Sequence, residues 1–325
     1  MKKNMISVAA ALVALAALQG CGGGGGGGGF AVPATSASAP AAAEPAATAP
    51  APAPAPAQTA GPEPSTPADP TACLTAPQPG SSADVGNGYE GVWYQHAATG
   101  VNGLMLVGAA GDSVGFTVPA SSTASMVESM FYGAFNFDTA NSSWQIGSGK
   151  VSAYPSTTWG TLSGSGSFVP KTSLSGTYAE DAAASKSFGP WKYELENSLA
   201  VDSSLLAGAW GGYMSNILGS IDIASDGRFT GSTAASSPLG SCSLTGSVLP
   251  REPGTRKNNL SVALNVANAA QSGQKNCAMG SLSDGLGFVE VTQNTTNGTC
   301  KRSMRLYMFF KDSAGKYSAS LAFPK

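Results

Sequence analysis

The sequence contains few charged residues and a single histidine. Of its 325 residues, 17 are Lys or Arg and 19 are Asp or Glu, so the formal net charge is −2. A nucleic-acid-binding surface needs a clustered basic face, and this composition provides none, so we expect no nucleic acid partner. Good helix formers are scarce after the N-terminus while Gly and Ser are abundant, which argues against a fold built from long helices.

Long hydrophobic runs are also missing. The apolar run at residues 6–18 has thirteen residues, whereas a helix that spans a bilayer needs about 20. The run follows Lys2 and Lys3, and a short positive region before an apolar run of this length is typical of a signal peptide. The alternative is a buried helix. We predict a signal peptide over residues 1–20, and therefore export.

Cys21 closes this leader in the sequence LQGC, with Leu18 three residues before the cysteine and Gly20 directly before it. This motif resembles the lipobox of bacterial lipoproteins, although Gln19 is not the commonest residue at its variable position. The resemblance implies cleavage before Cys21 and acylation of its thiol and new amino group by chains such as palmitate. Stable anchoring needs more than one chain, so a triacylated Cys21 implies membrane attachment. Gly22 is compatible with the outer membrane, while the leaflet stays undecided.

Residues 21–85 are predicted to be a disordered tether. Eight glycines follow Cys21, and alternating Ala and Pro come after them. Glycine loses the most backbone entropy on ordering, and proline removes a backbone donor and disfavours helix before it. The Ala-Pro part favours an extended spacer that reaches on the order of 100 Å, with the glycines as a swivel. The alternative is a low-complexity segment without a role.

The rest of the chain is predicted to be all-β. Sixteen short runs rich in β-branched or aromatic residues alternate with turn signals such as Gly111-Asp112, Asp226-Gly227 and Asp284-Gly285. Eight runs fall in residues 86–200 and eight in residues 201–325, and both parts open on Gly-x-Trp, at Trp93 and Trp210. We predict two antiparallel β-barrel-like modules of about eight strands each. The Gly-x-Trp opening is similar to that of calycin barrels, and we expect both tryptophans to be core residues.

Local patterns give three finer predictions. Alternation in residues 300–310 places Met304, Leu306 and Met308 on the core face of a strand. Asp202 before two leucines predicts a capped helical turn between the modules. Residues 121–131 are interpreted as a short helix, of the kind that often closes a barrel mouth, with an ordinary loop as the alternative.

Four cysteines remain after Cys21. An even number in an exported chain indicates disulfides, with three possible connectivities. We favour Cys242–Cys277, bracing the second module, and Cys73–Cys300, pinning the end of the tether to it. No Cys-x-x-Cys or neighbouring histidine supports a metal site, so we expect neither a metal nor another cofactor.

Catalytic motifs are not evident in the sequence. A Ser-His-Asp triad would have to use His96, no Gly-x-Ser-x-Gly elbow between a strand and a helix is predicted, because residues 111–115 fall on a turn and a strand, and the carboxylates are scattered through turns. We therefore expect no enzymatic activity, with an envelope hydrolase as a remote alternative. Basic residues concentrate in the second module, where they suit either lipopolysaccharide phosphates or solvated strand edges. They are Arg251, Arg256, Lys257, Lys301, Arg302 and Arg305.

The order of leader, lipidated cysteine, tether and β modules is similar to the layout of Gram-negative surface lipoproteins such as the transferrin-binding and factor-H-binding families. The similarity is one of architecture and transfers no ligand. Our leading hypothesis is a lipid-anchored outer-membrane lipoprotein that displays β-barrel modules to a protein, glycan or small ligand. The alternative is a structural or accessory envelope lipoprotein without a ligand. An open barrel lumen favours the first hypothesis, and solidly packed interiors favour the second.

Overall fold

The computed structural model describes residues 71–96, 101–119, 129–153, 158–181, 183–214, 217–237, 239–279, 282–312, 315 and 317–325. The predicted signal peptide, Cys21 and the tether up to residue 70 lie outside this range. The described residues all belong to one compact unit, Ser65–Lys325. None of the helices among them is both long and apolar enough to cross a membrane.

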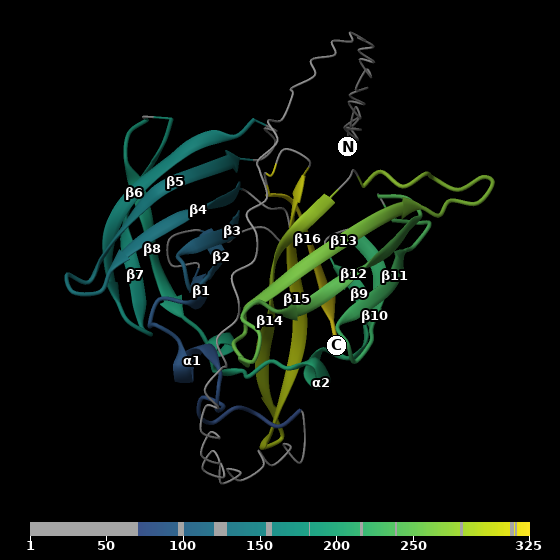
Figure 1. Cartoon of the computed structure of the whole chain (residues 1–325), viewed down its shortest axis with the longest axis horizontal. Helices are drawn as coiled ribbons and strands as arrows, with labels where there is room; N and C mark the ends of the chain where they lie inside the picture. The colour runs from purple at the N-terminus through teal and green to yellow at the C-terminus, as the bar shows by residue number, and fades with distance from the viewer. Residues whose placement is uncertain are drawn as a thin grey trace, which may run out of the picture. The chain divides into compact units, whose positions relative to one another are not determined.

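The first eight strands form a closed antiparallel barrel in which each strand pairs with the next and β1 pairs with β8 (Figure 1). The short helix α1, Ser82–Val85, precedes them. The strands are β1 Gly91–Gln95, β2 Val101–Val107, β3 Asp112–Pro119, β4 Ser129–Asp138, β5 Ser143–Ala153, β6 Gly160–Val169, β7 Ser173–Glu180 and β8 Lys186–Tyr193. Strand β4 starts at Ser129, so the last three residues of the predicted 121–131 helix are strand; the others lie outside the described residues.

The remaining eight strands form a second antiparallel sheet, also in sequence order, that curls until its outer strands β9 and β16 lie side by side. Its strands are β9 Gly208–Met214, β10 Ile217–Ile223, β11 Arg228–Thr233, β12 Cys242–Pro250, β13 Leu260–Asn268, β14 Leu282–Thr296, β15 Thr299–Asp312 and β16 Tyr317–Pro324. The predicted all-β fold with two eight-stranded, barrel-like sheets is thus confirmed. The sheets fall within residues 86–200 and 201–325; that each range is a separate domain stays a prediction.

The connection between the sheets contains the 3-10 helix η2, Leu195–Ser198, and the helix α2, Ser203–Leu206. The carboxylate of Asp202 accepts a hydrogen bond from the backbone nitrogen of Leu205, which caps α2 as predicted. Helix α2 then leads directly into β9.

One predicted turn is wrong. Asp284 and Gly285 lie within β14, where the pairing with β15 shifts its register between Ser283 and Gly285. A Cβ atom at Gly285 would overlap the backbone carbonyl oxygen of Phe309. The glycine therefore permits close approach of two strands at a β-bulge rather than a reversal of the chain. The other two predicted turns occur: Gly111 and Gly227 have φ of +81° and +82° between successive strands.

Each sheet encloses its own core. Trp93 and Trp210 are fully buried in the first and second cores, as predicted from their Gly-x-Trp motifs. Leu306 and Met308 are fully buried in the second core, and Met304 packs against it while partly exposed. The predicted core face of β15 is therefore confirmed.

The opposite face of β15 is also buried, which the alternation did not predict. Tyr307 and Phe309 join Leu286 and Phe288 of β14 in a third apolar cluster. Their partners are the outward-facing side chains of barrel strands β1, β2 and β3, namely Val92, Leu104, Leu106 and Val114. We call this contact between barrel and hairpin the seam. The β14–β15 hairpin thus contributes one face to the second core and the other to the seam.

The two disulfides in the structure are the two favoured pairings, Cys73–Cys300 and Cys242–Cys277. Cys242 is the first residue of β12, and Cys277 lies in the connection from β13 to β14 rather than on a strand. Next to Cys73, Ala72 forms a β-bridge with Lys301. The chain is therefore attached to β15 before it reaches the first barrel.

Candidate functional site

The first barrel is hollow at one end. A cavity of about 310 Å³ lies where β1, β5 and β7 end and β4, β6 and β8 begin. We call it the mouth. The lining residues are Gln95, Thr117, Ser129, Phe131, Val151, Leu162, Tyr178, Glu180, Lys186, Ser187, Phe188, Gly189 and Trp191. Residues 97–100, 120–128, 154–157 and 182 lie outside the described residues.

The opposite end of the lumen is filled by aromatic rings. Trp144 projects over Gly176 of β7, where a Cβ atom would lie 2.7 Å from its ring. Phe135 packs on Trp144 with ring centroids 5.3 Å apart, and Phe137 packs edge-on to Phe168 at 5.2 Å. Gly176 leaves room for the Trp144 ring, and the rings fill this end, whereas the aromatic rings at the mouth line a cavity. The barrel is therefore closed at one end and hollow at the other.

The wall of the mouth is apolar and aromatic. Phe131, Phe188 and Trp191 are buried and contact one another, with ring centroids 5.4–6.2 Å apart. Val151 and Leu162 complete the wall and are also buried. Pockets for small molecules are commonly of this size or larger and are mostly apolar, with a few fixed polar groups. The mouth fits that description.

Two glycines hold the indole of Trp191 in place. A Cβ atom at Gly103 of β2 would lie 2.6 Å from its Cη2, and one at Gly189 would lie 2.8 Å from its Cδ1. Gly189 has φ of +91°, a conformation suited to glycine. Nε1 is bonded to Cδ1, so the indole N–H lies at the Gly189 end of the ring, where it is buried. This N–H has no acceptor among the described residues.

The rim of the mouth is polar. The hydroxyls of Thr117 and Ser129 lie 2.7 Å apart in a hydrogen bond. Lys186 donates to Glu180 at 3.0 Å and lies over the ring of Tyr178, 5.7 Å from its centroid. The single cation of this lining is thus engaged with a carboxylate and an aromatic face.

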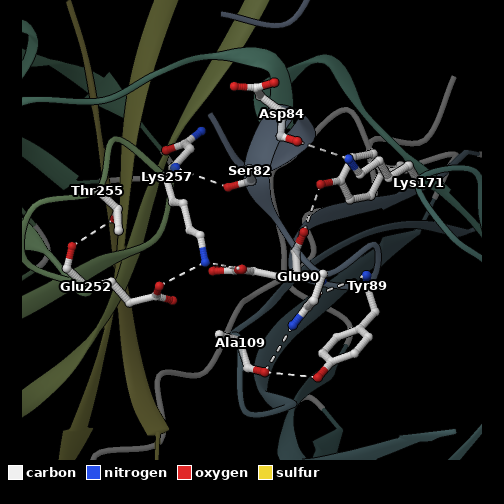
Figure 2. A network of polar contacts seen from close by, with 12 residues as sticks. Ser82, Asp84, Tyr89, Glu90, Ala109, Lys171, Glu252, Thr255 and Lys257 are labelled. Carbon is white, nitrogen blue, oxygen red and sulfur yellow. Dashed lines mark hydrogen bonds and ion pairs between the residues drawn. The ribbon is translucent and has the colours of Figure 1, made fainter. Parts of the chain in front are cut away.

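A charged cluster lies between the residue before β1 and the β12–β13 connection. Lys257 donates to Glu90 and to Glu252, each at 2.8 Å (Figure 2). Burial raises the pKa of Glu90, and the bonds to Lys257 offset only part of that effect. Burial lowers the pKa of Lys257, but its two carboxylate partners outweigh this and leave the pKa raised. The cluster joins Glu90, directly before β1, to Glu252 and Lys257 of the β12–β13 connection. These ion pairs connect the two sheets, so we assign the cluster a structural role.

Glu196 is a second buried carboxyl at the seam. Glu196 belongs to the η2 helix, and one of its carboxyl oxygens has no hydrogen-bond partner among the described residues. Burial, with a smaller contribution from the nearby Glu290 and Glu194, raises the pKa of Glu196 to about 8. The group is therefore neutral in the folded protein at neutral pH.

The other predicted residues occupy different places. His96 lies 2.7 Å from Glu194 and is largely exposed, and no serine is among its hydrogen-bond partners in the described chain. Four of the six basic residues form ion pairs: Arg251 with Asp112, Arg256 with Asp202, Lys257 as above and Arg305 with Glu290. Cys21 lies outside the described residues.

The residues of the mouth were not predicted as a site. Phe188 and Trp191 are three residues apart in sequence, yet both line the lumen. The reason is an extra residue in β8, which shifts its pairing with β7 between Leu174 and Gly176. Alternation alone would place Phe188 and Trp191 on opposite faces. A Gly-Pro pair within a strand often marks such a bulge, and Gly189-Pro190 was the available signal.

Comparison of the chain with protein-family models, with curated proteins and with solved structures gives no match.

Proposed function

We propose that the protein is a lipid-anchored outer-membrane lipoprotein whose first barrel binds a small ligand in its mouth. The observation that carries the proposal is the hollow mouth, with its apolar wall and polar rim, in a barrel that is otherwise packed. A stability role alone gives no reason to leave this end of the lumen unfilled, since interiors normally pack to high density.

The second sheet supports the barrel in this proposal. Its core is a large buried cluster, and the seam fixes its long hairpin against β1, β2 and β3. The LQGC sequence supports attachment through Cys21, and residues 21–70 supply the length between membrane and barrel. The packed second core also supports the alternative, an accessory envelope lipoprotein, for that part of the chain.

Ligand binding is tested with the fluorescent probe 1-anilinonaphthalene-8-sulfonate and the full chain carrying Cys21→Ala, which has no acyl groups and needs no detergent. In this parent, Leu162→Trp places an indole ring in the mouth. Val169→Trp adds the same ring at an exposed site on the same strand (54% exposed) and is the matched control. We expect Leu162→Trp to weaken probe binding at least about tenfold and Val169→Trp to leave it unchanged.

Equal probe affinity in the two variants, with circular dichroism unchanged, would overturn the proposal. If Leu162→Trp does not fold, Ser129→Trp provides a second block, because Ser129 is at the rim and its change leaves the buried wall intact.

A further inference from the structure

The sequence contains three Asn-Gly pairs, at residues 87–88, 102–103 and 297–298. Asparagine is chemically labile, and in this pair the backbone nitrogen of the glycine can attack the side-chain amide carbon, because glycine has no side chain to shield it. The attack closes a succinimide ring and releases ammonia, and water then opens the ring to aspartate or isoaspartate. The three pairs are chemically alike, so their surroundings in the fold decide which of them reacts.

The first pair is held by hydrogen bonds to the asparagine side chain. Asn87 Oδ1 accepts from the backbone nitrogens of Tyr89 and Glu90, at 3.3 and 2.8 Å. Its Nδ2, the nitrogen that would leave as ammonia, donates to the backbone oxygen of Ala109 at 3.1 Å. Ring closure at this pair has to give up these bonds, which raises its cost.

The second pair lies inside the first barrel's sheet. Asn102 is opposite Val118 of β3, and Gly103 pairs with β3 on one side and with Gln95 of β1 on the other. A Cβ atom at Gly103 would also lie 2.6 Å from the ring of Trp191. Ring closure turns the backbone out of the extended conformation, so this part of β2 has to leave the barrel before it can react.

The third pair is the two-residue turn at the tip of the β14–β15 hairpin. The pairing of the two strands ends at Thr296 and Thr299. Asn297 and Gly298 are exposed, with φ of +51° and +74°. The side chain of Asn297 has no hydrogen bond within the described part of the chain, and a Cβ atom at Gly298 would meet nothing within 4 Å. Exposed loop tips of this kind open at little cost in free energy.

We propose that Asn297 is a deamidation site of the folded protein, and that the fold protects Asn87 and Asn102. The backbone nitrogen of Gly298 loses its proton and forms a bond to Cγ of Asn297. The bond from Cγ to Nδ2 breaks, and Nδ2 leaves as ammonia with that proton. One water molecule then opens the ring at either of its carbonyl groups, and no oxidant or reductant is needed. The product carries a carboxylate at the tip, so the formal net charge becomes one unit more negative than −2.

The test incubates the folded full chain carrying Cys21→Ala at mildly alkaline pH and analyses its proteolytic fragments by mass spectrometry. We expect Asn297 to convert at least about tenfold faster than Asn87 or Asn102, a difference that needs only about 1.4 kcal/mol of extra protection at those two sites. The product should include isoaspartate, because ring opening gives both acids whereas direct hydrolysis of the amide gives aspartate alone. In urea, the three rates should agree within about threefold, since unfolding removes the protection.

A matched pair of variants gives a second measurement, by ion-exchange chromatography of the intact chain. Asn297→Gln should lose the acidic form that accumulates during incubation, and Asn102→Gln should keep it. Equal rates at the three asparagines of the folded chain, or an intact Asn297 while the chain in urea reacts, would overturn the proposal. Aspartate without isoaspartate at residue 297 would overturn the ring-closure step. The fragment analysis needs neither glutamine variant, so it holds even if one of them does not fold.

Discussion

Tyr307 of β15 stacks on Phe288 of β14, with ring centroids 5.1 Å apart and ring planes at 7°. Both rings are on the hairpin face that covers the first barrel, while Met308, the next residue of β15, is in the second core. Because successive side chains of a strand point to opposite faces, two long strands serve both contacts. We expect the barrel and the second sheet to depend on each other through this hairpin.

The first prediction concerns that dependence. Phe288→Ala removes a fully buried ring from the seam, and such truncations cost about 3–5 kcal/mol. We expect a loss of this size in the free energy of unfolding, measured by urea denaturation. Leu249→Ala, at a residue that is 44% exposed, is the control and should cost less than about 1 kcal/mol. A similar small cost for both variants would show that the seam contributes little.

The second prediction concerns pH. Burial raises the pKa of Glu196 to about 8, while the unfolded chain releases this proton near pH 4.5. The stability linked to the protonated group is complete below about pH 4.5 and is lost as the pH rises towards 8. Between pH 5 and 8, the free energy of unfolding should fall by about 3 kcal/mol more in the native sequence than in Glu196→Gln, which stays neutral.

This measurement has an internal comparison. Glu180→Gln changes a partly exposed rim carboxylate and should leave the pH dependence of the native sequence in place. If Glu196→Gln and the native sequence lose the same stability between pH 5 and 8, Glu196 is not protonated in the fold.

The third prediction concerns the disulfides. Peptide mapping without reduction should recover Cys73 linked to Cys300 and Cys242 linked to Cys277. The Cys242–Cys277 bridge closes a loop with a sequence separation of 35, so replacing both cysteines by Ser should cost about 3–4 kcal/mol in the chain-entropy account. Free thiols at these positions in the exported protein, or other pairings, would refute the arrangement.

The fourth prediction concerns the anchor. Cys21→Ala removes the thiol that carries the acyl groups in the proposed anchor. Stable anchoring needs two or more acyl chains, so this variant has no anchor of that kind. We expect no incorporation of labelled palmitate and release of the protein from the membrane fraction. Ala17→Ser, within the predicted leader, leaves the cysteine in place and is the control. Continued membrane retention of Cys21→Ala would exclude the proposed anchor.

Local sequence patterns predicted much of the fold. The Gly-x-Trp openings, the capped turn at Asp202 and the inward face of β15 each depend on a few neighbouring residues, and the structure has all three. The turn at Asp284-Gly285 was wrong because a glycine's close contact with a distant strand resembles a turn signal in sequence. The covered outer face of β15 depends on the barrel, which no pattern within β15 specifies.

The mouth was harder to predict because it, too, depends on contacts between residues far apart in sequence. Its wall combines side chains from strands far apart in sequence, and the β8 bulge brings Phe188 and Trp191 to one side against their spacing. An unpaired indole N–H has no sequence signature at all, because its partner or lack of one is decided by the three-dimensional surroundings.

Ligand binding in the mouth is tested most directly by the affinity of anilinonaphthalene sulfonate for Leu162→Trp compared with Val169→Trp, both in the Cys21→Ala chain. Residue 162 is in the wall of the cavity and residue 169 is exposed on the same strand. A filled mouth should bind the dye at least about tenfold more weakly than the control. Equal affinities in two folded variants would contradict the proposal that the mouth is a binding site.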